Sequence, residues 1–91
     1  MVFTLELSRT AQKALNKLPA NAVKRIWAHL EEIKNDPYRP RPLADIVPVE
    51  GSDITYRLRI GRLRVEYEVH ENNDSIKISK IFRKKRSSDY R

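Results

Sequence analysis

The sequence has no cysteine, only two glycines and no long apolar run. Without cysteine, the chain can form neither a disulfide framework nor a zinc–cysteine site. This composition suits a reducing compartment, and we expect a cytoplasmic location. No apolar stretch approaches the roughly 18 residues of a membrane span, and the N-terminus lacks the basic start and apolar core of a signal peptide. We therefore expect no membrane association.

The sequence also lacks the motifs of several common metal and nucleotide sites. The two histidines show neither HxxxH nor HxH spacing, so a dedicated metal site is not expected. Neither GxGxxG nor GxxxxGK[ST] occurs, and we expect no cofactor. His29 is expected to be a solvated residue on a helix, and His70 to end a strand.

Charge is abundant and uneven. The 91 residues carry a net charge of +7. Residues 1–50 hold 8 Lys and Arg against 6 Asp and Glu, whereas residues 51–91 hold 11 against 6. A basic surface concentrated in one half is typical of proteins that bind phosphates or an acidic partner, although some small proteins are basic without such a role. The length favours one domain over residues 1–91.

The first half of the chain predicts a strand and two helices. Alternation in VFTLEL predicts a strand over 2–7. Ser8 is expected to cap a first helix, which Pro19 ends. A second helix is expected from about 20 to 35. Its predicted apolar stripe contains Val23, Ile26, Trp27, Leu30 and Ile33.

The second half predicts a loop and three strands. Four of the five prolines fall in 36–53, which favours a long loop without a helix or a central strand. Strands are expected over 54–60, 62–70 and 75–82. Gly61 supplies the first turn, and residues 71–74 the second. The alternation slips between Lys80 and Ile81, which indicates a bulge or a strand buried on both faces.

This order defines an α+β protein, β-α-α-β-β-β, with a mainly antiparallel sheet. The helical hairpin covers one face and leaves the other open. Arg57, Arg59 and Arg64 are expected on that open face. Because adjacent strands lie about 4.8 Å apart, their guanidiniums can converge on one phosphate. The alternative is a charge ladder with Glu66 and Glu68 on a solvated face.

The last nine residues, RKKRSSDYR, add a run of cations and an aromatic residue. A terminal aromatic among cations suits stacking on an unpaired RNA base. The alternative is a frayed basic tail. Taken with the hairpin, this tail gives the second half of the chain two features that favour nucleic acid.

The hairpin YRLRIGRLRVEYEV, the helix link LPANAVKRI and the tail RKKRSSDYR resemble the RelE/ParE superfamily of toxin–antitoxin toxins, and within it the RelE-like mRNA endonucleases. The resemblance covers nearly the whole chain. It implies the RelE-like microbial RNase fold. It also implies metal-independent cleavage of mRNA in the ribosomal A site, which inhibits translation. In that reaction the RNA 2′-hydroxyl attacks the adjacent phosphate and leaves a 2′,3′-cyclic phosphate.

The resemblance assigns roles by position. The catalytic set it implies is Arg57, Arg59, Arg64, Arg86 and Tyr90. Further RNA contacts are expected from Arg62, Arg83, Lys84, Lys85 and Arg91. One departure matters, since well-studied members carry a lysine as general base where Arg59 stands here, and arginine is a poor base. The general base therefore stays open, with Tyr90, Lys84 and Lys85 as candidates.

The resemblance also implies partners, namely a RelB-like antitoxin, the ribosome and mRNA. Two other functions fit the same fold. One is a ParE-like toxin that poisons DNA gyrase by binding to it, and the other is a catalytically degenerate relative that only binds RNA or a partner protein. The full basic and aromatic set in this chain favours cleavage.

Overall fold

The structure is a computed structural model that describes residues 2–40 and 45–84. In chain order the elements are β1 (Thr4–Leu7), α1 (Arg9–Asn16), α2 (Ala20–Ile33), β2 (Asp45–Pro48), β3 (Thr55–Ile60), β4 (Leu63–His70), a 3-10 turn (Glu71–Asn73) and β5 (Ser75–Arg83). Among the described residues, no helix is long and apolar enough to span a membrane.

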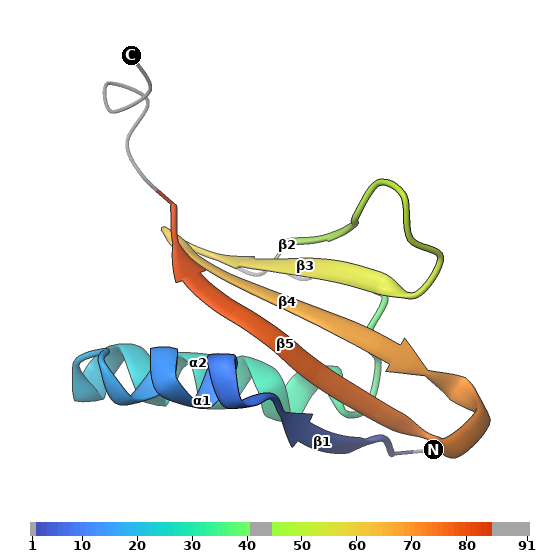
Figure 1. The fold of residues 1–91 in the computed structure, drawn as a ribbon, viewed down its shortest axis with the longest axis horizontal. Helices are drawn as coiled ribbons and strands as arrows, with labels where there is room; N and C mark the ends of the chain where they lie inside the picture. The colour runs from blue at the N-terminus through green and yellow to red at the C-terminus, as the bar shows by residue number, and fades with distance from the viewer. Residues whose placement is uncertain (1, 41–44, 85–91) are drawn as a thin grey trace.

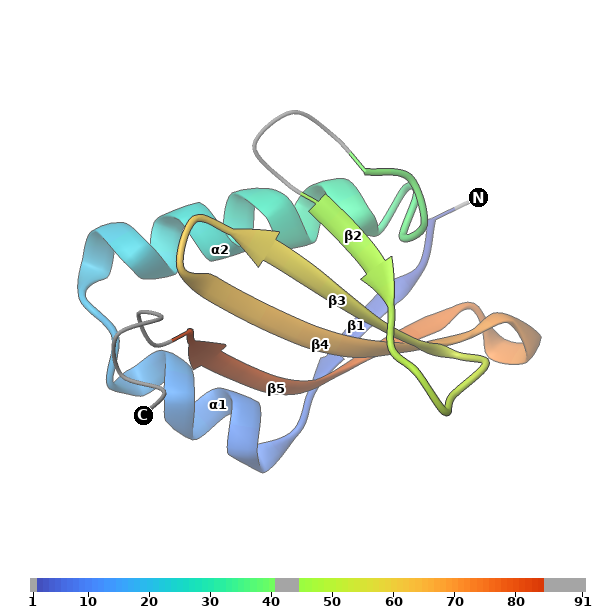
Figure 2. The same ribbon diagram turned by 90° about the horizontal axis from the view of Figure 1, so that it is seen from above.

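The five strands form one sheet in the order β1-β5-β4-β3-β2. Both helices lie against one face of it, and no described helix lies on the other face (Figures 1 and 2). The predicted α+β class is confirmed. The sheet is mixed, however, because β1 pairs with β5 in parallel while the other pairs are antiparallel.

The proline-rich segment contains a strand that the sequence did not predict. β2 occupies the sheet edge and pairs only with β3. An edge strand tolerates proline because one side of it donates no ladder hydrogen bonds, and Pro48 is its last residue. The proline density therefore excluded a central strand correctly, but it did not exclude this short edge.

The helices begin where the sequence predicts. The Ser8 hydroxyl caps α1 by accepting from the Ala11 backbone N–H at 3.0 Å, and it donates to the Ser79 carbonyl of β5 at 2.9 Å. The buried stripe of α2 consists of Ala22, Ile26, Leu30 and Ile33.

Two side chains of α2 differ from the prediction. Trp27 is 38% exposed rather than buried, because it stands one residue beyond the centre of the stripe. His29 is half-buried rather than solvated, and its Nδ1 lies 3.2 Å from a carboxylate oxygen of Glu32. His70 does end its strand, with its Nε2 3.0 Å from Glu68.

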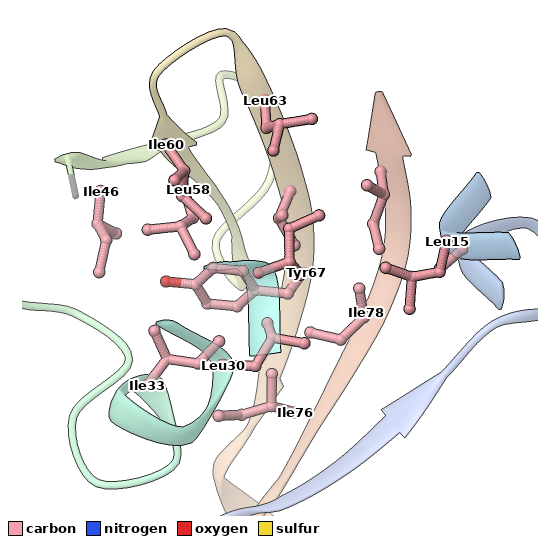
Figure 3. Close-up of a cluster of buried hydrophobic side chains, with 14 of the residues drawn as sticks. Leu15, Leu30, Ile33, Ile46, Leu58, Ile60, Leu63, Tyr67, Ile76 and Ile78 are labelled. Atoms are coloured by element: carbon pink, nitrogen blue, oxygen red, sulfur yellow. The ribbon is translucent and has the colours of Figure 1, made fainter. Parts of the chain in front are cut away.

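Tyr67 occupies the centre of the core (Figure 3). Its ring packs among strand residues such as Leu58 and helix residues such as Leu30. The buried hydroxyl donates to the Pro37 carbonyl at 2.5 Å. A buried hydroxyl needs such a partner, so this bond fixes the loop after α2 against the sheet.

Two backbone irregularities set the register of the open face. Gly61 adopts φ +59° in the β3–β4 turn, as expected. The predicted bulge in the last strand is present, but it falls at Ser79: Glu66 pairs with Lys80 and Tyr67 with Ile78. The extra residue lets Ile78 and Ile81 both reach the core.

Candidate functional site

The β3–β4 hairpin places its arginines by simple alternation. Leu58 is buried in the core, so Arg57 and Arg59 on either side of it leave the opposite, open face. The register sets Arg59 opposite Arg64 and Arg57 opposite Glu66. The three predicted arginines therefore do come together.

These arginines line a shallow depression of about 180 Å³ on the open face. Its walls are formed by Asp45, Val47, Arg57, Arg59, Arg64 and Lys84. We call its four cations, Arg57, Arg59, Arg64 and Lys84, the sheet-face cluster. Lys84 is held there by its backbone N–H, which donates to the Arg62 carbonyl at 2.8 Å.

Two members of the sheet-face cluster are paired with carboxylates. Arg57 donates from Nε and Nη2 to one oxygen of Glu66, at 3.0 and 2.7 Å. Arg59 forms an ion pair with Asp45 of β2. The ladder interpretation is thus right for Arg57 and wrong for Arg59. The Arg59–Asp45 pair is exposed, and Arg57 is 41% exposed in its pair with Glu66. Solvent-accessible pairs contribute only about 0–1 kcal/mol, so an incoming anion can displace these arginines from their carboxylates.

Arg64 differs from its neighbours because it is buried, with 9% of its surface exposed. Its Nη1 donates to the carbonyls of Gly61 at 2.7 Å and Leu63 at 3.0 Å. These bonds fix the guanidinium beneath the turn. A charge held in this way needs little reorganisation when negative charge develops beside it.

Phe82 is an aromatic residue on the open face that sequence reasoning did not select. It pairs with Arg64 across the β4–β5 ladder. Arg57 Cζ lies 6.0 Å and Lys80 Nζ 5.1 Å from its ring centroid. The available signal was the Ile81-Phe82 pair of apolar residues at the end of a strand, where one must face outward. An aromatic among cations suits base stacking.

Two predicted RNA contacts do not join this cluster. Arg62 lies in the β3–β4 turn and Arg83 ends β5, so Arg83 is part of the sheet rather than of the tail. Both line a different pocket, together with Arg25 of α2. The remaining predicted residues, Lys85, Arg86, Tyr90 and Arg91, lie outside the described residues.

The far end of the sheet carries a different chemistry. Tyr38, Tyr56, Asp53 and Glu71 line a pocket there. Burial, and then the hydrogen bond to Glu71, raise the pKa of Tyr38 well above its usual range, so this phenol stays neutral. Within residues 2–40 and 45–84, no three His, Asp or Glu side chains gather as a metal site would require.

The sequence matches one family of known proteins. Residues 5–88 match the family model described as the ParE toxin of the type II toxin–antitoxin system parDE. Two proteins of Methanocaldococcus jannaschii are similar in sequence. RelE1 is 37% identical over 84 residues, covering 92% of each chain. Toxin RelE3 is 31% identical over 83 residues, covering 91% of this chain and 92% of that protein.

Solved structures of RelE proteins are similar to this chain in fold. The archaeal RelE–RelB complex from Pyrococcus horikoshii OT3 contains a chain with a TM-score of 0.81 and 29% identity, covering 96% of this chain and all of that one. The E. coli RelBE complex shares the fold, with a TM-score of 0.74 and 20% identity over 92% of this chain and 99% of that one. The chain belongs to the RelE/ParE toxin family of type II toxin–antitoxin systems.

Proposed function

We propose that this toxin cleaves mRNA in the ribosomal A site without a metal ion and so inhibits translation. The observation that carries the proposal is the sheet-face cluster, in which guanidiniums from two strands and one ammonium converge on a single depression. Four cations around one shallow cavity match a phosphodiester, since guanidinium recognises phosphate oxygens through paired N–H donors.

In this proposal the scissile phosphate lies over the depression. Arg57 and Arg59 exchange their carboxylate partners for phosphate oxygens. Arg64, already fixed under the turn, stabilises the extra negative charge of the pentavalent phosphorane. Preorganised donors of this kind contribute roughly 3–4 kcal/mol each.

The proton acceptor need not be a lysine at position 59. Asp45 is the carboxylate that lines the depression, and a carboxylate accepts a proton where a guanidinium does not. The RNA 2′-hydroxyl gives its proton to Asp45 while its oxygen forms a bond to phosphorus. The bond from phosphorus to the 5′-oxygen breaks, and the Lys84 ammonium protonates that oxygen. The products are a 2′,3′-cyclic phosphate and a 5′-hydroxyl.

The tail residues keep the roles that the family resemblance gives them. Arg86 adds a further positive charge at the phosphate, and Tyr90 stacks on a base. Phe82 offers a second aromatic surface on the same face. Lys85 and Arg91 contribute to the hold on RNA.

The proposed partner is a RelB-like antitoxin, present in the same cytoplasm. Support comes from the solved relatives, which are described as RelE–RelB complexes. A toxin of net charge +7 favours an acidic binding segment, with fast association that slows as salt increases.

A second candidate function is gyrase poisoning, because the matching family model is that of ParE. That function requires binding without cleavage. A third is a degenerate relative that binds RNA but does not cut it. The crowded set of cations on the open face favours cleavage over both.

The test combines the purified chain with ribosomes that carry an mRNA, and maps cut sites with and without EDTA. We expect cuts at the A-site codon in both conditions, and weaker cutting by Arg86→Ala and Tyr90→Phe. Intact mRNA together with inhibited gyrase supercoiling would establish the second candidate instead. Loss of cutting in EDTA would refute the metal-free mechanism.

A further inference from the structure

We propose that the chain has a second phosphate-binding site, which holds the RNA backbone at the end of the sheet near the start of α2. We call it the turn-end pocket. It is lined by Pro19, Asn21, Ala22, Arg25, Arg62, Leu63 and Arg83. The inference rests on the proposed function, because it gives the RNA that is cut over the sheet-face cluster a second point of attachment.

Three arginines from separate parts of the chain meet in this pocket, whose volume is about 280 Å³. Arg25 comes from the second turn of α2, Arg62 from the β3–β4 turn and Arg83 from the end of β5. Both ribbon views place these three segments at one end of the molecule (Figures 1 and 2). Arg25 reaches the turn itself, since its Nη2 lies 3.2 Å from where a Cβ on Gly61 would stand.

The three guanidiniums of the turn-end pocket have no acidic partner in the part of the chain that the structure describes. Among the described residues, no carboxylate lies within ion-pair distance of Arg25, Arg62 or Arg83. All three residues are exposed. Like charges brought to one place repel each other, and an anion between them removes that cost. The pocket is therefore built to attract negative charge before any ligand arrives.

The start of α2 adds to this attraction. Its N-cap is Pro19, which makes no side-chain capping hydrogen bond, and its first turn contains no acidic residue. No side chain of the first turn therefore neutralises the positive end of this 14-residue helix. Pro19 and Asn21 line the pocket, so this helix end lies at the pocket wall. Backbone N–H groups at such a helix end favour phosphate oxygens.

The position of the pocket favours a polymer of phosphates over an isolated anion. Arg83 and Lys84 are consecutive, yet Arg83 lines the turn-end pocket and Lys84 the sheet-face cluster. Arg62 and Lys84 are also joined by a backbone hydrogen bond of 2.8 Å. One RNA backbone that passes the β3–β4 turn can thus contact both sites, and its successive phosphates supply an anion to each.

The test compares two double variants that lose the same charge. Arg25→Gln/Arg62→Gln removes two cations of the pocket, and Arg9→Gln/Lys13→Gln removes two exposed cations of α1. Binding of a labelled single-stranded RNA is measured over a series of salt concentrations. The binding constant K falls as salt increases, and a plot of log K against log salt is less steep by about 0.7 for each phosphate contact that is lost. We expect a decrease of about 1.4 for the pocket variant and little change for the α1 variant.

Several outcomes distinguish the sources of the anion. Equal decreases in both variants would overturn the inference, because net charge alone would explain them. A pocket variant that binds RNA like wild type but loses affinity only for an acidic antitoxin peptide would also overturn it. Unchanged binding of the single-stranded RNA, with weaker binding only to ribosomes that carry no mRNA, would overturn the attachment of the cut RNA and assign the pocket to ribosomal RNA instead. Thermal unfolding of each variant checks that it is folded.

These results separate the inference from the proposed function. RNA affinity is measured without cleavage. If the protein cuts no mRNA but the pocket variant shows the weaker salt dependence, the second site stands and the nuclease proposal fails. A chain that cuts mRNA, with an unchanged slope in the pocket variant, would lose the second site alone.

Discussion

The sheet-face cluster and the turn-end pocket use the same side chain in opposite electrostatic settings. In the first, Arg57 is bonded to Glu66 and Arg59 is paired with Asp45. In the second, no described carboxylate neutralises Arg25, Arg62 or Arg83. The β3–β4 turn separates the two groups, and both lie at the same end of the sheet.

The difference suggests a division of labour. The arginines of the turn-end pocket attract a polyanion at a distance. They bind it without first breaking ion pairs to described carboxylates. A paired group stays ordered in the absence of ligand, and it exchanges weak carboxylate pairs for phosphate when RNA is close. The paired group also keeps a carboxylate, Asp45, at the edge of the depression, where the proposed mechanism places the reacting atoms. In the proposed mechanism, the pairing therefore supplies both the order and the general base.

The largest expected effect comes from removing the carboxylate of Asp45. Asp45→Asn should bind RNA more tightly, because Arg59 is released, and should cut it about 10²–10⁴-fold more slowly, because general base catalysis is lost. Single-turnover cutting and RNA affinity are measured on the same variant. Glu66→Gln is the matched control, since it removes the same charge from the same face. A similar rate loss in both variants would refute the role of Asp45 as base.

The next effect comes from Arg64, the one buried member of the sheet-face cluster. Arg64→Gln should lower the maximum cutting rate about 10²–10³-fold, as the loss of one preorganised donor does. Arg64→Lys retains the charge but not the bonds to the turn carbonyls, so it should recover only part of the rate. Full recovery with lysine would mean that charge alone matters.

A smaller effect is expected from Gly61, which lies between the two groups. Gly61→Ala forces a side chain into left-handed backbone, which costs roughly 1–2 kcal/mol, and it crowds Arg25. We expect a lower melting temperature and weaker RNA binding. Unchanged binding in the folded variant would show that the turn does not organise the turn-end pocket.

The smallest effect concerns stability. Glu66→Gln removes the negative charge that pairs with Arg57, yet it should change the free energy of unfolding by less than about 1 kcal/mol, because the Arg57 side chain stays 41% exposed to solvent. Urea unfolding measures this change. A loss of several kcal/mol would assign the pair to the fold rather than to the site.

Local patterns predicted most of the fold. Alternation in the hairpin correctly placed Arg57, Arg59 and Arg64 on one face, and Ser8 and Gly61 correctly marked a helix start and a turn. The contacts between segments that lie far apart in the sequence could not be predicted.

Three features of the site depended on contacts between distant parts of the chain. Asp45 meets Arg59 only because a four-residue edge strand pairs with β3. Arg62 and Arg83 meet Arg25 only because α2 packs under the sheet. The Ser79 bulge, which turns Phe82 outward, depends on the register between β4 and β5. The first two pairings have no local sequence signal. The bulge did leave one, the slip in alternation at Lys80 and Ile81, but its position at Ser79 is set by the pairing with β4.

The most direct test of the division of labour measures cutting of ribosome-bound mRNA by two double variants over a range of protein concentrations. For Arg57→Gln/Arg59→Gln, the account predicts a lower maximum rate that added protein does not restore. For Arg25→Gln/Arg62→Gln, it predicts a higher half-saturating concentration, with the rate recovered at saturation. Equal losses of maximum rate in both variants would contradict it.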